Sequence, residues 1–242
     1  MGKNIIQQAR GKGSTTYRAP SFKYKGKSRH LPMSTTPLTG KVVEIIHCRG
    51  HSAPLLKVQF NGFEYGLMVA PEGIRIGDNI TYGTQEIKTG NCMKLIDMPE
   101  GTIVYNIEVQ PGDGGKMVRA GGAFAKVIAK YNNRVIVQLP SKKQREFMPE
   151  CRASIGILAG GGRLEKPLLK AGAAFHRMKA RNKLWPIIGG KSANAVDHPY
   201  GGGSSARKGK PTIAPRFAPP GRKVGMIRPR KSGRAKSVRI AA

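Results

Sequence analysis

The stretch KVVEIIHCRGHSAPLLKVQFNGFEYGLMV, residues 41–69, carries the clearest structural signal in this chain. Val, Ile, Leu and Phe dominate three short runs within it, at residues 41–47, 54–60 and 63–69, and such runs are typical of β-strands. Asn61-Gly62 lies between the second and third runs, and this dipeptide favours the type I′ turn of a β-hairpin. The stretch therefore predicts antiparallel β-structure.

Short apolar runs continue beyond this stretch, separated by glycine and proline. Runs at residues 80–82 and 93–96 bring the expected strands to five within about sixty residues, which indicates a small closed barrel. Pro99-Glu100-Gly101 then opens a second set of runs, at residues 103–109, 124–131, 134–139, 145–148 and 154–158. Helical periodicity is confined to residues 167–183. We expect a mainly β chain with one short helix and two small barrels in tandem, at residues 36–98 and 99–165.

The charge of the chain is large and unevenly distributed. The 242 residues include 43 Lys or Arg and 13 Asp or Glu, a net charge of +30. Residues 1–35 carry eight basic residues and no acidic one, and residues 176–242 carry 17 basic residues against the single Asp197. Residues 36–175 have a net charge of only +6. Charge gathered at both ends repels itself in a compact state and favours a polyanionic partner, which we expect to be nucleic acid.

Other partners and compartments fit the composition less well. Binding to a membrane surface calls for an amphipathic helix with large apolar residues opposite its cations, and neither basic end has one. We find no apolar run long enough to span a bilayer and no apolar core of a signal peptide. The three cysteines, Cys48, Cys92 and Cys151, are widely spaced and indicate no disulfide framework. We expect a cytoplasmic protein with no membrane partner.

The basic ends differ in composition from a domain that folds alone. The last 40 residues, 203–242, hold 12 basic residues, no acidic residue and only six Leu, Ile, Val or Phe. So little apolar surface cannot offset about 1–2 kcal/mol of backbone entropy per ordered residue, and we expect this arm to order only when phosphates neutralise it. In residues 1–35 aromatic side chains are interleaved with lysines, which suits base stacking but equally fits a flexible tail.

A glycine-bracketed loop follows the expected helix. Gly189-Gly190 and Gly201-Gly202-Gly203 enclose the polar segment NAVDHPY, residues 194–200. Five glycines cost backbone entropy, and a chain accepts that cost where its backbone has to approach something closely. The loop has almost no apolar residues to pack on, so we expect it to lie against a partner. We expect Asp197 to hold His198 in one orientation.

Three other kinds of site fail on spacing or on structural support. Gly190-Lys191-Ser192 ends like a phosphate-binding P-loop, but Trp185 occupies the position of the required first glycine. His47-Cys48-Arg49-Gly50-His51 lacks the fourth ligand and the second ligand pair of a structural zinc site. Asp197-His198 lacks the rigid packing that a hydrolase needs. We therefore expect no catalytic residue, no metal site and no cofactor.

The loop motif resembles a known signature. Residues 194–203, NAVDHPYGGG, are similar to the NPVDHPHGGG signature of the universal large-subunit ribosomal protein L two family, called L eight in eukaryotes. Further matches to this family are YNIE at 105–108, PGDGG at 111–115, CRASIG at 151–156 and KAGA at 170–173. The short basic N-terminus resembles the archaeal and eukaryotic branch. Ala195 and Tyr200 depart from the signature's proline and second histidine, so no role of that histidine is carried over.

The resemblance implies an OB-fold barrel, then an SH3-like barrel, then an extended C-terminal arm. From the residues we expect a basic extension at residues 1–35 and a helix with an extended basic arm at residues 166–242. The resemblance also implies binding to large-subunit rRNA near the peptidyl transferase region, where the protein supports subunit association, tRNA binding and peptide-bond formation without being an enzyme. The implied partners are rRNA, neighbouring ribosomal proteins and the small subunit, with no homo-oligomer. A general, chromatin-like nucleic-acid-binding protein is the alternative, because a large positive net charge favours binding to rRNA and to DNA alike.

The residues that we expect to contact RNA are basic, aromatic or part of the glycine-bracketed loop. RNA is recognised through its shape, its phosphates and its splayed bases, and such a mixed set suits all three. The set comprises Lys116, Arg119, Arg152, Arg177, Lys179, Arg181, Lys183, Trp185, Asn194, Asp197, His198, Tyr200, Gly201, Gly202, Gly203, Arg207, Lys208, Lys210, Arg216, Arg222 and Lys223.

Overall fold

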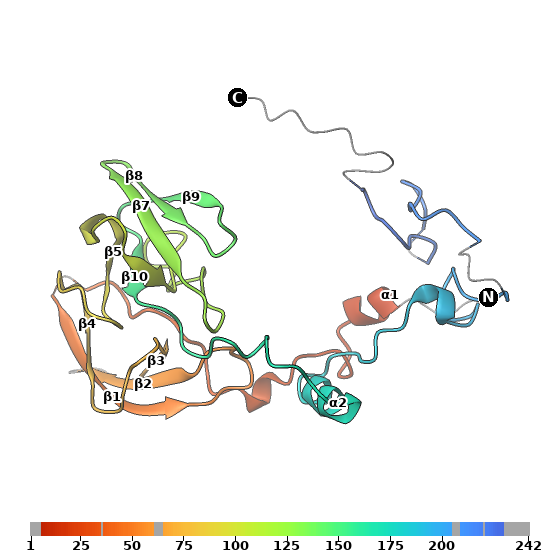
Figure 1. Ribbon diagram of the computed structural model, residues 1–242, viewed down its shortest axis with the longest axis horizontal. Coiled ribbons are helices and arrows are strands. Elements are labelled where there is room, and N and C mark those ends of the chain that lie inside the picture. The colour runs from red at the N-terminus through yellow and green to blue at the C-terminus, as the bar shows by residue number, and fades with distance from the viewer. Residues whose placement is uncertain (1–5, 35, 61–64, 205–208, 220, 230–242) are drawn as a thin grey trace. The chain divides into compact units, whose positions relative to one another are not determined.

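The computed structural model describes residues 6–34, 36–60, 65–204, 209–219 and 221–229. The chain divides into two compact units: Ser21–Leu168, called the body below, and Met1–Pro20 with Leu169–Ala242, called the arm unit. Figure 1 labels the helices and strands of both. The turn expected at Asn61-Gly62 lies outside the described residues, as do the expected RNA contacts Arg207 and Lys208.

The first half of the body is a five-stranded part of one continuous ladder. Strands β3, β2, β1 and β4 pair antiparallel in that order, and the register of β1 against β2 shifts between Val42 and Glu44. β4 and β5 meet in parallel at a single residue pair, Tyr82 and Cys92. The five strands are β1 (Leu38–Ile46), β2 (Leu55–Phe60), β3 (Gly66–Val69), β4 (Asn79–Tyr82) and β5 (Cys92–Lys94).

The second half continues the ladder through β10, which pairs with both β5 and β6. The order along the sheet is β3-β2-β1-β4-β5-β10-β6-β7-β8-β9. β6 ends earlier than the run at residues 103–109 predicted, because Asn106 adopts a left-handed φ of 49°. The elements of this half are the short helix η2 (Leu95–Asp97) and strands β6 (Ile103–Tyr105), β7 (Ala125–Tyr131), β8 (Arg134–Gln138), β9 (Gln144–Phe147) and β10 (Arg152–Ile155).

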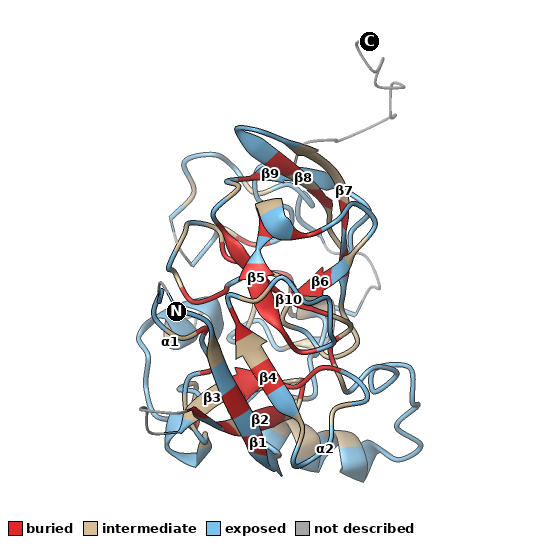
Figure 2. Cartoon of the chain, turned by 90° about the vertical axis from the view of Figure 1, so that its left-hand side faces the viewer, coloured by how far each residue is buried: buried red, intermediate tan, exposed pale blue. Residues whose placement is uncertain are grey.

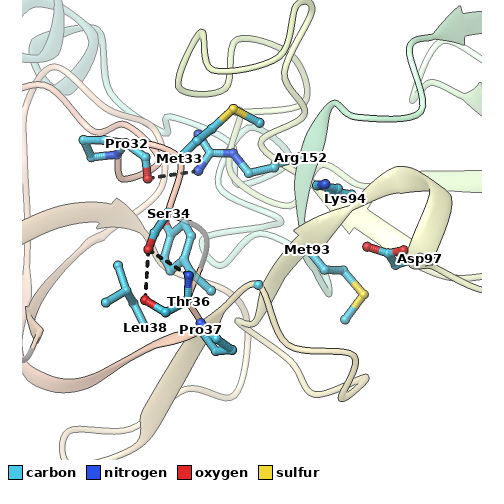
Figure 3. A pocket seen from close by; sticks show the side chains of 12 residues that line it. Pro32, Met33, Ser34, Thr36, Pro37, Leu38, Met93, Lys94, Asp97 and Arg152 are labelled. Atoms are coloured by element: carbon cyan, nitrogen blue, oxygen red, sulfur yellow. Dashed lines mark hydrogen bonds between the residues drawn. The ribbon is translucent and has the colours of Figure 1, made fainter.

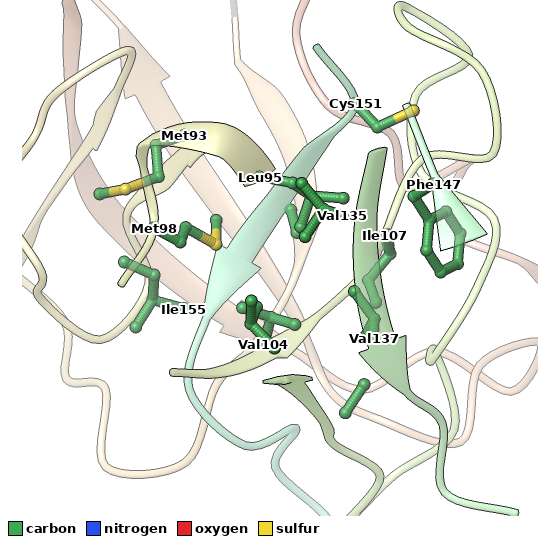
Figure 4. Close-up of a cluster of buried hydrophobic side chains, with 13 residues drawn as sticks. Met93, Leu95, Met98, Val104, Ile107, Val135, Val137, Phe147, Cys151 and Ile155 are labelled. Atoms are coloured by element: carbon green, nitrogen blue, oxygen red, sulfur yellow. The ribbon is translucent and has the colours of Figure 1, made fainter. Parts of the chain in front are cut away.

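Each half of the body has its own apolar core. Inward and outward residues alternate along β8, as the two-residue period of a strand requires, so Val135 and Val137 are buried. Figure 2 shows buried residues running along the strands of both halves, and Figure 4 shows the second core. The first core includes Val42, Leu56, Val58, Phe60 and Ile80, and the second includes Leu95, Val104, Ile107, Val127 and Phe147. The expected mainly β fold with two small barrels is confirmed.

The two halves are joined through shared residues. Met93 and Leu95, which lie in the range expected for the first barrel, pack in the second core. A third buried cluster contains side chains from both halves, namely Cys48, Ala53, Leu55, Val69, Tyr105 and Leu158. The halves therefore form one unit, because β5 belongs to the ladder of the first half and contributes side chains to the core of the second.

Part of the expected N-terminal extension belongs to the body. After the short helix η1 (Ser21–Lys23), Leu31 packs against the first core and His30 is buried. His30 donates a hydrogen bond from Nε2 to the backbone oxygen of Asn106 (2.6 Å), and its Nδ1 lies 3.3 Å from the hydroxyl of Tyr82. Burial lowers the pKa of His30 to about 4, so the ring is neutral at pH 7. The segment before β1 is therefore attached to the body through the uncharged side chain of His30.

The arm unit brings the two basic ends of the chain together. It contains α1 (Ile6–Gly11), α2 (Ala171–Lys179) and the short helix η3 (Gly190–Ser192), and none of these helices has a buried residue. α2 confirms the expected helix, whereas α1 lies in a segment whose sequence shows no helical period. The Nδ2 of Asn182, beyond α2, donates a hydrogen bond to the backbone oxygen of Arg18 (3.0 Å). Tyr17 and Trp185 line one hollow of about 310 Å³.

No helix within the described residues combines the length and the apolar character needed to cross a membrane.

Candidate nucleic-acid interface

The glycine-bracketed loop of the arm unit is folded by its own backbone. The N–H groups of Asp197 and His198 both donate to the carbonyl oxygen of Asn194, at 3.0 and 3.1 Å. The N–H of Gly201 donates to the carbonyl of His198 (2.9 Å), and the N–H of Gly202 to that of Ala193 (3.3 Å). These bonds close two consecutive turns, so the loop keeps a defined shape without a partner.

His198 is fixed within this loop on two sides. Its Nδ1 accepts a hydrogen bond from the backbone N–H of Tyr200 (3.0 Å), and the centres of the two rings are 5.1 Å apart. On the other side, a Cβ atom on Gly190 would overlap the imidazole ring. Because Nδ1 is an acceptor, the neutral ring carries its proton on Nε2. The backbone N–H of Tyr200 therefore orients the ring, and the expected role of Asp197 in holding His198 stays a prediction.

Tyr200 anchors the loop through apolar contacts, a role that its sequence context does not indicate. Only 7% of its surface is exposed, and it packs against Val224 from the C-terminal segment. Its hydroxyl donates a hydrogen bond to the backbone oxygen of Pro211 (3.0 Å), and the backbone oxygen of Val224 lies 3.3 Å away. Burying a hydroxyl without a partner is costly, so these carbonyls fix the ring in place. A buried, bonded Tyr200 cannot also be a stacking surface for RNA, which corrects that expectation.

The glycines of the loop serve its internal fold in most places. A Cβ on Gly201 would collide with the backbone of Ala193 and Asn194, and Gly202 and Gly203 have left-handed φ values of 80° and 82°. Gly189 differs, because nothing lies within 4 Å of the position of its Cβ. The entropy cost of these glycines is therefore offset largely by contacts within the chain, and their presence alone does not require a partner.

The loop exposes a polar tip beside basic segments. Asn194 and Asp197 are exposed, and the Nζ of Lys191 donates a hydrogen bond to the backbone oxygen of Gly202 (3.2 Å). The sequence of the arm unit holds 22 basic residues and one acidic residue. Among the expected contact residues, Lys179, Lys183, Lys210, Arg216 and Arg222 are exposed, and Arg177, Arg181, Trp185 and Lys223 are partly buried.

Cations and aromatic rings are paired on the surface of the arm unit. The guanidinium of Arg216 lies 5.4 Å from the ring centre of Phe217, whose surface is 89% exposed. The Nζ of Lys179 lies 5.7 Å from the ring of Phe175. Such pairs offer a stacking face beside a positive charge, the combination with which proteins bind single-stranded nucleic acid. Neither phenylalanine was among the residues expected to contact RNA, although Arg216-Phe217 is adjacent in sequence.

A pocket of about 420 Å³ opens beside His198. Gln7 and Gln8 of α1 line it together with His198 and Lys223. The two amides lie nearly 200 residues before His198 in the chain. Sequence reasoning missed them because only the tertiary structure brings the N-terminal helix to this place.

The three expected contact residues of the body differ in exposure. The side chain of Lys116 is 62% exposed and its Nζ lies 3.2 Å from Asp113. Arg119 is partly buried and donates hydrogen bonds to the backbone oxygens of Gly115 (3.0 Å) and Ser28 (2.8 Å). That Lys116 and Arg119 contact RNA stays a prediction.

Arg152 does not lie on the surface, which corrects the expectation that it contacts RNA. The side chain of Arg152 is 9% exposed and that of Glu108 is fully buried, and their charged atoms are 2.8 Å apart. Glu108 also accepts hydrogen bonds from the backbone N–H groups of Arg152 (2.9 Å) and Gly114 (3.2 Å). Burial alone would raise the pKa of Glu108, but hydrogen bonds from Arg152 and its charge outweigh burial and lower it. The guanidinium therefore balances a buried carboxylate and is unavailable to phosphate.

The body also carries cation–aromatic pairs, none of whose residues is among the expected RNA contacts. The Nζ of Lys57 lies 4.1 Å from the ring centre of Tyr65, and the guanidinium of Arg134 lies 5.5 Å from that of Tyr131. The second pair lies directly across the β7–β8 connection, where Tyr131 pairs with Arg134, so strand register could have revealed it. In the part of the chain that the structure describes, no three His, Cys, Asp or Glu side chains group in a way that could hold a metal ion.

Comparison with known proteins identifies the class. Residues 88–224 match the family described as Ribosomal Proteins L2, C-terminal domain, so the chain is a ribosomal protein. It is 49% identical over 236 residues to the large ribosomal subunit protein uL2 of Natronomonas pharaonis, and this covers 97% of each chain. It is 48% identical over 239 residues to that of Methanopyrus kandleri, covering 97% of this chain and 98% of the relative. The chain therefore belongs to the uL2 family of large-subunit ribosomal proteins, as its resemblance to archaeal members indicated.

Proposed function

We propose that this protein is a structural, non-enzymatic component that binds large-subunit rRNA close to the peptidyl transferase region. Its partners there are the rRNA, neighbouring ribosomal proteins and, across the interface, the small subunit. The observation that carries the proposal is the folded loop around His198 within a unit of 22 basic residues and one acidic residue. Its site of action is the ribosome in the cytoplasm.

The two units differ in core packing and in charge, and we assign them different roles in RNA binding. The body has two apolar cores and a moderate excess of basic residues, 21 against 12 acidic ones, so it provides a rigid platform. The arm unit has one small buried cluster, Tyr200 with Val224, among its described residues. Its cations neutralise phosphates, and the loop presents the edge of His198 in a preorganised orientation. Preorganisation lowers the entropy cost of binding, because the loop does not have to be ordered by the RNA.

A general nucleic-acid-binding protein is disfavoured by the same features. Duplex DNA readers commonly place a helix with a packed rear face in the major groove. α2 has nine residues and none of them is buried, so it has no such support. Filter binding at moderate salt against rRNA and against duplex DNA of equal length tests this choice. Equal affinity for both would overturn the rRNA proposal.

A matched pair of variants tests the role of the loop. Gly190→Ala forces a methyl group into the ring of His198, whereas Gly189→Ala places the same methyl group in open space. Neither glycine has a left-handed φ, so alanine is compatible with both backbones. We expect Gly190→Ala to displace His198 and to lower subunit joining or peptide-bond formation in reconstituted particles by up to about 100-fold, the cost of misplacing a positioned group by about 1 Å. Gly189→Ala should behave like the wild type.

Measuring the affinity of the free protein for rRNA shows whether a variant acts on the functional centre or on RNA binding itself. The loop adds little to a site held by many phosphate contacts, so both variants should bind rRNA about as tightly as the wild type. If Gly190→Ala joins subunits and forms peptide bonds normally while NMR shows a displaced His198 ring, the loop does not shape the functional centre.

A further inference from the structure

The body contains a cavity of about 400 Å³ at the point where its two halves part. β4 ends at Tyr82 and β5 continues to Lys94, so the two strands separate after the single pair Tyr82 and Cys92. Figure 3 shows the segment entering β1 on one side of the space and the side chains of Met93, Lys94 and Asp97 on the other. None of these residues belongs to the glycine-bracketed loop or to the arm unit.

The walls of the cavity are fixed by hydrogen bonds. Arg152, whose charge is balanced by Glu108, extends its Nη1 to within 3.5 Å of the backbone oxygen of Pro32 and so holds the entering segment in place. The Oγ of Ser34 accepts a hydrogen bond from the N–H of Thr36 (3.2 Å) and forms a second contact with its hydroxyl (3.3 Å). The cavity is therefore a formed feature of the body and does not need a ligand to open it.

The floor of the cavity includes a short backbone edge at Lys94, the last residue of β5. The carbonyl of Cys92 accepts from Gly83 on the β4 side, and the N–H of Leu95 donates to Cys151 on the β10 side. Because backbone groups alternate between the two edges of a strand, the N–H of Lys94 points to the β4 side, where β4 has ended, whereas its C=O caps the first turn of η2. A single N–H donor is too short an edge for strand addition, but it suits a ring nitrogen or carbonyl oxygen on the edge of a single base.

The side chains around this edge have the complementary chemistry. Met33 gives a polarisable apolar wall and Pro37 a flat one, and an aromatic base packs well against such walls. On the rim, the exposed carboxylate of Asp97 accepts hydrogen bonds of the kind that a base amino group donates, and the exposed ammonium of Lys94 suits a phosphate. The volume lies at the lower end of the roughly 300–1,000 Å³ of small-ligand pockets, large enough for a nucleoside and too small for a folded segment.

We propose that this cavity receives one unstacked nucleotide of the large-subunit rRNA, with its base against Met33 and Pro37 and its phosphate near Lys94. The inference rests on the proposed rRNA binding and adds a contact that involves no arm residue. RNA-binding proteins commonly capture splayed bases of single-stranded loops in this manner, by combining stacking with hydrogen bonds to base edges.

Two substitutions at one exposed position test the proposal on the full chain. Thr36→Phe fills the cavity, whereas Thr36→Ser keeps the hydroxyl that contacts Ser34 and leaves the cavity open. We expect Thr36→Phe to raise the Kd for cognate large-subunit rRNA by about 5- to 150-fold, the usual effect of losing a stacked base, and Thr36→Ser to have no effect. The increase should be the same at every salt concentration, because no ionic contact is lost. Lys94→Ala should instead reduce the slope of log K against log salt by about 0.7–0.9.

Chemical probing of base edges identifies the nucleotide. One unpaired nucleotide should be protected by the wild type and by Thr36→Ser and become reactive with Thr36→Phe, while circular dichroism shows the same melting temperature for all three proteins. If the wild type prefers rRNA to duplex DNA but Thr36→Phe binds rRNA within twofold of Thr36→Ser, this inference is wrong and the proposed function stands. If the wild type shows no preference for rRNA, the proposed function itself fails. A Thr36→Phe protein that binds rRNA normally but no longer co-assembles with another ribosomal protein also overturns the inference.

Discussion

Acidification should destabilise the body through His30. In the folded protein burial lowers the pKa of this imidazole to about 4, against an ordinary value of 6.5. Between these two values the unfolded chain binds a proton that the folded chain does not. Stability is therefore fully present above pH 6.5 and is lost as the pH falls from 6.5 towards 4.

The expected loss follows from the two pKa values of His30. On going from pH 7.5 to pH 5, a shift from 6.5 to about 4 lowers the free energy of unfolding by about 2 kcal/mol. With an m value of ~2 kcal/mol per M, the urea midpoint should fall by about 1 M. The pKa of Glu108 is lowered from an ordinary value of 4.5, so that carboxylate stays charged throughout this range.

The assay has to follow the body and exclude contributions from other groups. Trp185, the single tryptophan, belongs to the arm unit, so far-UV circular dichroism in urea is the appropriate signal. The control is His30→Gln, which keeps an amide donor for the backbone of Asn106 but cannot titrate. The pH effect specific to His30 is the difference between the two proteins, and NMR of the imidazole Cε1–H gives its pKa directly. A folded-state pKa near 6.5, or equal pH dependence in both proteins, would refute the reasoning.

Three further changes test other contacts of the chain. Glu108→Gln should lower the free energy of unfolding by roughly 3–5 kcal/mol, because it leaves the buried charge of Arg152 without its partner. Urea titration at pH 7 measures this loss, and a loss below about 1 kcal/mol would show that the pair is not buried in solution. Tyr200→Phe should cost about 1–3 kcal/mol in the local stability of the loop, seen as faster amide exchange at Gly201 and Val224, and unchanged exchange would contradict the role of its hydroxyl. If the two basic ends neutralise ~8 phosphates, log K for rRNA should fall with log salt at a slope of about −6 to −7. Removing residues 1–20 and 204–242 should make this slope less steep. An unchanged slope would assign the phosphate contacts to the body.

The sequence by itself determined the class of fold and the family. Strand runs such as residues 54–60 and 134–139 reappear as β2 and β8, because their two-residue burial period is a local property of the chain. The helix predicted within residues 167–183 is α2, and the signature at residues 194–203 identified a family that the relatives confirm. Net charge and its uneven placement are likewise readable without coordinates, because they depend only on residue counts.

Only the tertiary structure decided which polar residues face solvent. Arg152 looked like a phosphate contact because its sequence neighbours say nothing of Glu108, which lies 44 positions earlier and buries the guanidinium. Tyr200 looked like a stacking ring, but Val224 and the carbonyl of Pro211 enclose it. Burial and pairing across long separations depend on how the chain is brought together, and a sequence pattern reports only the contacts of near neighbours.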